Sequence, residues 1–493
     1  MVDIYAVSSA LAQRSARKRI DPGSAETGER GVPPGPGASG IRQSLAWFRD
    51  PVRYMRRCRE RYGDIFSVRL GRLKRASFVS NPDAVRTLFT ADPGLVRMGP
   101  TNEIFRPVLG SGSLFLLDGE EHHRHRRLMM PAFRRGHVRR FGELTVELTE
   151  RDLATWPVGE PFRVADRMRK LNLELIFDVA FGVAEGARRR RLRGLLVELL
   201  DRVERPLAVM PQFQHELGGR SPFGRVMRIA RAIDGLLYEE IRERRFDPDA
   251  PSRDDVLSML VAAGPEDPGF MTDREIRDEA ITLLIAGYNT TATATAWAFE
   301  RLVRHPEALE RATADLRAGD HAYLSAAVKE ALRQRPVLPV TARKLSAPME
   351  LGGYGFPERW TLMPCIYLLH HDPRLYPEPQ SFRPERFLGE PPEPHAWIPF
   401  GGGVRHCIGS NLALHMMETI LATILPRVRL SAPSDEPEPI VRRNFTLSPG
   451  RGATIIFLGP RTQARRFPAG ERRFAAPAPT HGAPHAPGDG RSS

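Results

Sequence analysis

The stretch Phe400-Gly-Gly-Gly-Val-Arg-His-Cys-Ile-Gly409 is a glycine-rich loop with a single cysteine, and a helical pattern begins directly behind it. Consecutive glycines permit backbone angles that a side chain would forbid, so the loop can fold tightly. Cys407 is expected at or near the helix N-terminus, where free amide groups, the helix dipole and Arg405 favour a thiolate. Such a thiolate is a candidate ligand for a metal such as haem iron. The alternative is a small buried apolar residue, which most lone cysteines are.

A second stretch predicts a long helix from Thr272 to His305. A capping box formed by its first residue and Glu275 starts it, and its apolar middle places it in the centre of the molecule. That middle also contains Gly287, Asn289 and several threonines, which are poor choices for a buried helix and indicate a functional site. Gly287 would let a flat ligand approach, and Thr290 would hydrogen-bond to the preceding turn. The alternative is a core helix whose threonines all bond backward.

A shorter helix, predicted to open at Asp118, places His122 and Arg126 four residues apart and therefore on one face. A histidine and an arginine at this spacing can bind a carboxylate of a ligand. The alternative is an ordinary solvated basic face, because charge runs are usually that. Further along, residues 206–222 break the helical period and indicate a mobile connection, either a lid or a plain loop.

Short strands accompany the helices. Residues 65–70 and 76–80 alternate in polarity and are expected to pair. Residues 349–355, with 361–367 after a turn, indicate a hairpin, and further short strands near 453–458 close the fold. The pattern predicts a mainly α protein with small β-sheets.

The 493-residue chain has a formal net charge of +14. Its basic residues are nearly all arginines spread along the chain without an aromatic-basic motif, so nucleic acid is not an expected partner. The excess charge gives weak support for an acidic protein partner. The densest run, Arg188 to Arg191, is predicted to be a solvated helix face. Cys58, Cys365 and Cys407 are far apart, which leaves no disulfide framework and suits a reducing cytoplasm.

Composition divides the chain into three parts. Residues 1–31 are expected to be a flexible N-terminal extension, without the about 20 apolar residues of a membrane anchor or the charge order of a secretory signal. Residues 32–460 are expected to form a single domain. Residues 461–493, rich in arginine, alanine and proline, are expected to be a disordered tail. We therefore expect a cytoplasmic protein with no membrane anchor.

Taken together, the motifs resemble those of the cytochrome P450 family, the haem-thiolate monooxygenases. The loop Phe400-x-x-Gly403-x-Arg405-x-Cys407-x-Gly409 resembles the family's haem-binding loop. Four motifs occur in the family's order within residues 32–460, and a chance match of all four is negligible. The other three are Ala286-Gly287-x-x-Thr290-Thr291 for oxygen activation, Glu330-x-x-Arg333 with Arg386 for a buried ion cluster, and His122-x-x-x-Arg126 for the haem-propionate helix.

The resemblance implies a cytochrome P450 fold with haem b between the long central helix and the helix behind the cysteine loop. It implies a monooxygenase that inserts one oxygen atom of O2 into an apolar organic substrate, such as a fatty acid, terpenoid or polyketide-like molecule. Electrons would come from NAD(P)H through a ferredoxin or flavodoxin and its reductase, since the chain has no flavin or nicotinamide fingerprint. A monomer is expected. The alternatives are a non-enzymatic haem-thiolate sensor and a peroxide-driven peroxygenase of the same fold.

The resemblance also implies roles for single residues. Cys407 would be the axial ligand of the haem iron. The family has Asp or Glu before the helix threonine, whereas this chain has Asn289, which can orient water but cannot relay a proton by ionising. The other expected catalytic residues are Thr290 and Thr291. The expected cofactor-binding residues are His122, Arg126, Ala286, Gly287, Arg343, Phe400, Gly403, Arg405 and Gly409, of which His122, Arg126, Arg343 and Arg405 would pair with the propionates.

Two surfaces follow from the resemblance. The substrate pocket is expected to be lined by residues 93–114, 206–222, Tyr288, 339–341 and 445–447. A redox partner is expected to dock on the basic side near Cys407, at a face formed by Arg124, Arg405 and His406.

Overall fold

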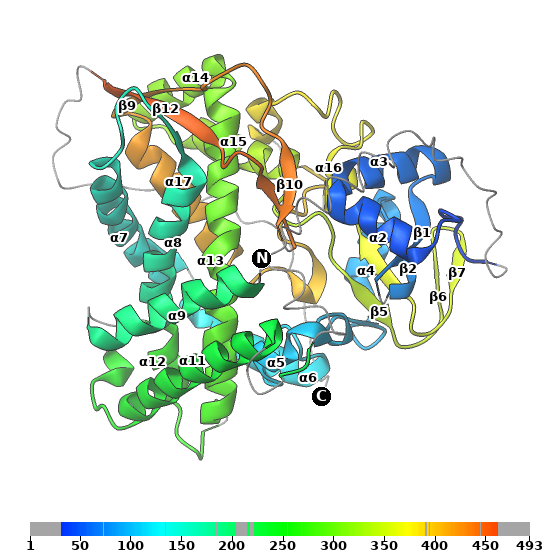
Figure 1. Ribbon diagram of the computed structural model, residues 1–493, viewed down its shortest axis with the longest axis horizontal. Helices are drawn as coiled ribbons and strands as arrows, with labels where there is room; N and C mark the ends of the chain where they lie inside the picture. The colour runs from blue at the N-terminus through cyan, green and yellow to red at the C-terminus, as the bar shows by residue number, and fades with distance from the viewer. Residues whose placement is uncertain are drawn as a thin grey trace, which may run out of the picture.

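Helix α13 (Asp273–Val303) passes through the middle of the molecule, as the sequence predicts (Figure 1). It begins at the predicted capping box, in which the Glu275 amide donates to Thr272 Oγ1 (3.3 Å) and the Thr272 amide donates to Glu275 Oε2 (2.8 Å). Trp297 and Phe299, near its other end, are fully buried. Pro306 then begins the next helix, because proline is well suited to a first turn.

The computed structural model describes residues 31–461 apart from 72, 134, 183–185, 204–213, 217–220, 254, 268, 390–391, 394 and 444. The helices other than α13 are α2 (Gly40–Arg49), α3 (Pro51–Tyr62), α4 (Pro82–Thr90), α5 (Arg106–Leu109), α6 (Gly119–Met129), α7 (Arg135–Leu153), α8 (Val164–Phe181), α9 (Ala187–Val203), α11 (Pro222–Arg245), α12 (Val256–Val261), α14 (Pro306–Arg317), α15 (Ala322–Gln334), α16 (Ile366–His370) and α17 (Ser410–Ile424). The strands are β1 (Ile65–Leu70), β2 (Leu73–Val79), β3 (Val96–Arg97), β4 (Pro161–Arg163), β5 (Arg343–Leu345), β6 (Met349–Leu351), β7 (Tyr354–Phe356), β8 (Thr361–Pro364), β9 (Val428–Ser431), β10 (Ile440–Arg443), β11 (Thr446–Pro449) and β12 (Thr454–Pro460).

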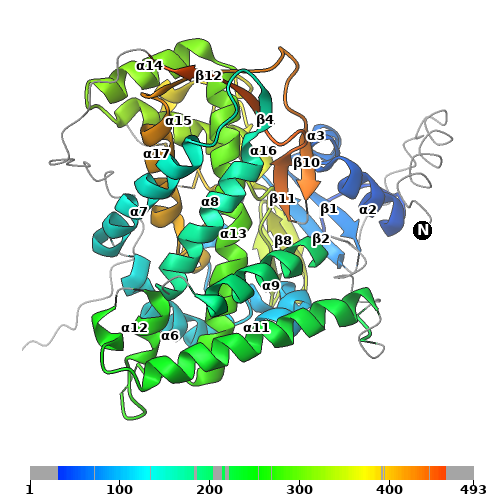
Figure 2. The same cartoon turned by 60° about the vertical axis from the view of Figure 1, so that its left-hand side comes forward.

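Other helices surround α13. Helix α8 packs along it, helices α9 and α11 lie near its N-terminal half, and α14 and α15 lie near its C-terminal end (Figure 2). Helix α17, which follows the cysteine loop, packs against α7 and α13. A large apolar core joins these helices, so α13 is held from several sides.

The main sheet lies beside the helical part and carries α2, α3 and α4 (Figure 1). Its strand order is β1-β2-β8-β5-β3. Strands β1 and β2 pair antiparallel, as predicted for residues 65–70 and 76–80. The predicted hairpin is wrong in one respect: β6 pairs with β7 across Gly352 and Gly353, while β8 joins β2 and β5. Two glycines with positive φ close the short hairpin, which leaves the next strand free to pair elsewhere.

Three predicted segments lie outside the described residues in whole or in large part: the N-terminal extension, the tail from 461, and the candidate lid at 206–222. Among the helices of the described chain, none has both the length and the apolar character needed to cross a bilayer.

Candidate functional site

The cysteine loop folds back on itself ahead of α17. The Cys407 amide donates to the Phe400 carbonyl (3.0 Å), and the helix begins three residues after the cysteine. Gly403 has φ of 64°, and a Cβ at this position would lie 2.3 Å from the Phe89 carbonyl oxygen, so glycine is required. Gly409 differs, because a Cβ there would meet only Phe133, at 4.0 Å. The close packing predicted for the loop is therefore found at Gly403 and not at Gly409.

The Cys407 thiol combines surface exposure with an apolar setting. Its residue retains accessible surface, yet burial of the thiol raises its pKa, against smaller lowering effects of the Gly409 amide and the Arg126 charge. Without a bound cation, burial therefore opposes the thiolate that the helix start favours. A bound metal cation would reverse this balance, because a coordinating thiol is deprotonated.

The middle of α13 keeps accessible surface over a short stretch of between one and two turns. Residues 276–284 and 291–303 are buried, whereas residues 285–290 keep accessible surface. Thr290 lies in this turn, and its hydroxyl donates to the Ala286 carbonyl (2.7 Å), as predicted. Asn289 lies beside it, and its side-chain oxygen accepts a long bond from Thr293 (3.5 Å). Thr291 is buried, so the polar side chains that keep accessible surface in this turn are those of Tyr288, Asn289 and Thr290.

Gly287 lies at the contact between α13 and α8. A Cβ there would lie 2.5 Å from Cδ1 and 2.8 Å from Cγ1 of Ile176, so the missing side chain lets α8 approach α13. The neighbouring Asn172 of α8, which the sequence interpretation missed, donates to the carbonyls of Gly287 and Tyr288. An amide side chain flanked on both sides by leucines, Leu171 and Leu173, is the signal that could have identified it.

This contact predicts a rescue experiment. Gly287→Ala should lower the unfolding free energy by about 1–3 kcal/mol, because the added methyl overpacks the α8–α13 contact. In Gly287→Ala/Ile176→Ala, the atom nearest to the new methyl would be the Cβ of residue 176 at 3.7 Å, an ordinary contact. Gly287→Ala should therefore lower the unfolding free energy by less in the Ile176→Ala background than in the wild-type background. Denaturant titration of the wild type, the two single variants and the double variant measures this difference. Equal cost in both backgrounds contradicts the packing role.

Four basic residues predicted to bind the propionates gather near the cysteine loop. His122 and Arg343 are buried, Arg405 is nearly so, and Arg126 is half-buried. Burial, followed by the charges of Arg405 and Arg126, lowers the pKa of His122 to about 3. Burial, followed by the charge of Arg405, lowers the pKa of Arg343 to about 10. These effects show that the four groups repel one another across a small region.

Two of these four basic residues have no carboxylate partner among the described residues, which fits an anionic ligand. Arg405 forms an ion pair with Asp118 and donates to the Leu114 carbonyl (2.9 Å). In the part of the chain that the structure describes, neither Arg126 nor Arg343 has a carboxylate within ion-pair distance. A buried cation without a counter-charge is costly. Two carboxylates placed between these groups and Cys407 would remove that cost, so the residues present fit the propionates of haem.

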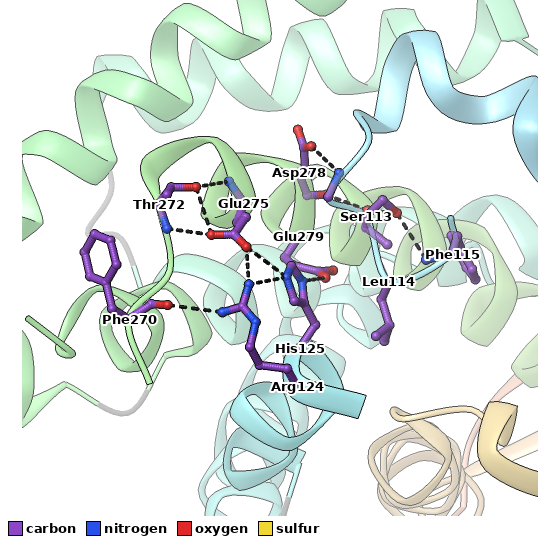
Figure 3. Close-up of polar contacts among 12 residues, drawn as sticks. Ser113, Leu114, Phe115, Arg124, His125, Phe270, Thr272, Glu275, Asp278 and Glu279 are labelled. Atoms are coloured by element: carbon purple, nitrogen blue, oxygen red, sulfur yellow. Dashed lines mark hydrogen bonds and ion pairs between the residues drawn. The ribbon is translucent and has the colours of Figure 1, made fainter. Parts of the chain in front are cut away.

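Helix α6, which carries His122 and Arg126, is fixed to α13 by a polar cluster (Figure 3). His125 Nδ1 lies 2.7 Å from Glu279 Oε1, and His125 Nε2 lies 3.2 Å from Glu275 Oε1. Arg124 forms an ion pair with Glu275 and donates to the Phe270 carbonyl (3.1 Å). Burial raises the pKa of Glu279. The cluster holds the propionate helix against the helix that bears Thr290.

Apolar residues gather on the side where the substrate is expected. The rings of Phe105 and Phe445 lie 4.9 Å apart, and Tyr288 keeps accessible surface in the open turn. Leu447 is buried and is tied to α13 through its carbonyl, which accepts from Trp297 Nε1 (2.9 Å). The predicted lining segments 93–114 and 445–447 therefore contact each other, whereas most of 206–222 lies outside the described residues.

Comparison with known proteins agrees with this geometry. The family model for cytochrome P450 matches residues 33–456. Cytochrome P450 135B1 of Mycobacterium tuberculosis is 37% identical over 464 residues, which are 93% of this chain and 98% of that protein. Cytochrome P450 137 of the same organism is 36% identical over 434 residues, which are 87% of this chain and 91% of that protein.

Solved structures confirm the fold. The retinoic acid-bound cyanobacterial CYP120A1 superposes with a TM-score of 0.74 at 22% identity, covering 87% of this chain and 99% of that one. The haem domain of cytochrome P450DA gives a TM-score of 0.72 at 23% identity, covering 87% and 97%. The mainly α fold with small β-sheets is thereby confirmed. The chain belongs to the cytochrome P450 family of monooxygenases, which bind haem b.

Proposed function

We propose that this cytochrome P450 inserts one oxygen atom of O2 into an apolar organic substrate, such as a fatty acid, terpenoid or polyketide-like molecule. Electrons would come from NAD(P)H through a ferredoxin or flavodoxin and its reductase. The observation that carries the proposal is the open turn of α13, where Thr290 and Asn289 keep accessible surface between two buried stretches of the helix. The apolar contact between Phe105 and Phe445 supports an apolar substrate.

Each residue of the site would have a definite task. Cys407 would be the thiolate ligand of the haem iron, and Phe400, whose carbonyl accepts from the Cys407 amide, would pack beside it. His122, Arg126, Arg343 and Arg405 would bind the two propionates, for which arginine donors are well suited. When bound, haem supplies the binding and reductive activation of O2, assisted by electron donation from the thiolate. Ala286 and Gly287 would form the helix face opposite the cysteine loop.

Thr290 and Asn289 would control the delivery of protons. The Thr290 hydroxyl donates to the Ala286 carbonyl, so its oxygen remains an acceptor that can hold a water molecule in the open turn. Asn289 can orient a second water molecule with its amide, although it cannot exchange a proton by ionising. Thr291 is buried, and we propose that it supports this turn without contacting the reacting atoms.

This assignment predicts how electrons divide between product and peroxide. Thr290→Ala should lower the product formed per NADH consumed by about tenfold or more, because general acid–base groups contribute at least that much. Asn289→Asp should change the same ratio more than it changes substrate affinity, since a carboxylate can ionise. The measurement is product and hydrogen peroxide per NADH, with substrate affinity from spectral titration. Equal ratios in the wild-type and variant proteins would remove the proton-delivery role.

The docking face near Cys407 needs revision. Arg405 is 7% exposed and paired with Asp118, so it cannot contact a partner. Arg124 forms an ion pair with Glu275, so a substitution that reverses the charge of Arg124 would place two carboxylates together. Arg127, on the same helix, is exposed. We therefore propose that Arg127, together with His123 and His406, which are also exposed, contributes to the docking face for an acidic redox partner.

Charge reversal tests the revised face. Arg127→Glu should slow electron transfer from a ferredoxin several-fold at low ionic strength, and the difference should shrink at high salt, because steering by exposed charges is screened. The control is Arg191→Glu, an exposed arginine on α9. Stopped-flow reduction of both variants is the measurement. Equal rates in the two variants at low salt would place the docking site elsewhere.

Two alternatives predict different responses. A haem-thiolate sensor would consume no additional NADH when an apolar compound is supplied with surrogate redox partners, whereas the monooxygenase would. A peroxygenase would form product from hydrogen peroxide at a rate that Thr290→Ala leaves unchanged. The presence of Thr290 at the open turn favours the monooxygenase. We further propose that residues 32–460 form one catalytic unit that acts as a cytoplasmic monomer.

A further inference from the structure

Asn172 is a buried polar residue on the face of α8 that contacts α13. It is 3% exposed, and Leu171, Leu173, Leu175 and Ile176 around it in the sequence are also buried. Its Nδ2 lies 2.6 Å from the Gly287 carbonyl oxygen and 2.6 Å from the Tyr288 carbonyl oxygen. A side-chain amide nitrogen carries two donor hydrogens, so it can serve both acceptors at once. Leucine would fill a similar volume without the cost of burying an amide, so packing alone does not explain this residue.

The acceptors of Asn172 lie within the open turn itself. Ala286, Gly287 and Tyr288 are consecutive, and each of their carbonyls accepts a hydrogen bond from a side chain: the first from Thr290 and the other two from Asn172. A carbonyl has two lone pairs, so it can accept such a bond in addition to a helical one. The two carbonyls held by Asn172 belong to the peptide units that lead into Tyr288 and Asn289, directly before Thr290.

A second contact from α8 reaches the same turn. Ile176 is one turn after Asn172 on the same face of α8, and its Cδ1 fills the position that a Cβ of Gly287 would occupy. Helix α8 thus holds the turn by a polar contact and an apolar contact together. Residues 285–290 nevertheless keep accessible surface, so the turn is held on the α8 side and open on another.

We propose that Asn172 is a positioning residue for the reaction: its amide fixes the peptide planes of Gly287 and Tyr288 and thereby the direction in which Asn289 and Thr290 face the open turn. Asn172 contacts neither substrate nor cofactor and acts only through the backbone of α13. The proposal rests on the proposed roles of Thr290 and Asn289. It identifies a residue outside all four sequence motifs as a determinant of how efficiently electrons are used for product.

The test compares haem-loaded Asn172→Leu with a matched control, Gln334→Met. Gln334 is also a buried amide that donates to a backbone carbonyl, that of Gln380 (2.7 Å), but it lies on α15. Hydrogen–deuterium exchange in a peptide covering residues 284–293 is expected to rise about tenfold in Asn172→Leu and to stay unchanged in the control. Product per NADH is expected to fall several-fold only in Asn172→Leu, while both variants melt at lower temperature than the wild type.

Each other outcome overturns the proposal. Unchanged exchange in residues 284–293 of Asn172→Leu means that the amide does not hold the turn. Raised exchange with unchanged product per NADH means that the contact is structural only. If Asn172→Leu does not fold, Asn172→Ser, whose shorter side chain cannot reach both carbonyls, is judged by the same two readouts. Thr290→Ala serves as a separate arm: unchanged product per NADH in that variant contradicts the proposed function, whereas the exchange result tests the role of Asn172 independently.

Discussion

Cys407→His is expected to abolish oxygenation while retaining part of the haem. Imidazole can ligate iron, but it does not donate electron density as a thiolate does. The loss of product formation should exceed the about 10–100-fold loss that follows removal of an outer partner of a metal ligand. The measurements are product formation at saturating substrate and reductant, and haem content by absorbance.

A second cysteine provides the control. Burial raises the pKa of the Cys58 thiol to about 12, so this cysteine is inert at neutral pH. Cys58→Ala should therefore keep product formation close to that of the wild type at equal haem content. Product formation by Cys407→His at the wild-type rate would contradict the assignment of Cys407 as the ligand.

Glu330→Gln is expected to cause the largest loss of stability. Glu330 and Arg333 are fully buried, with Arg333 Nε 2.7 Å from Glu330 Oε2. Glu330 also accepts from the Arg383 amide (3.0 Å), and Arg386 Nε lies 3.5 Å from it. Removing the negative charge leaves buried arginine without a counter-charge, which costs about 3–5 kcal/mol. Denaturant unfolding monitored by circular dichroism should show this loss.

The control for this variant is an exposed pair. Glu358 and Arg359 lie 3.5 Å apart with side chains 55% and 81% exposed. Glu358→Gln should change the unfolding free energy by less than about 1 kcal/mol, because exposed ion pairs contribute little. A similar small change in Glu330→Gln would mean that the buried cluster, predicted from the motif, does not stabilise the fold.

Features encoded by neighbouring residues could be predicted from the sequence. The capping box of α13 and the bond from Thr290 to the preceding turn each involve residues within four positions of each other. Both follow from rules of helix geometry that do not depend on the rest of the fold. The loop before α17 was found for the same reason, since its glycines are adjacent.

Features that depend on distant partners could not be predicted. Gly287 faces Ile176, and the sequence does not show which helix packs on which side of α13. Arg189 was predicted to be solvated within its basic run, yet it is 7% exposed and pairs with Asp178 of α8. The raised pKa of the Cys407 thiol is another example, because burial is a property of the whole fold.

The ferrous–carbon monoxide spectrum of the purified haem-loaded protein tests the central claim most directly. We predict the long-wavelength Soret band that a thiolate ligand produces, and its replacement in Cys407→His by a band at the position typical of a nitrogen ligand. A wild-type band at the nitrogen-ligand position, or a thiolate band that survives in Cys407→His, would contradict the account of Cys407 as the ligand of the haem iron.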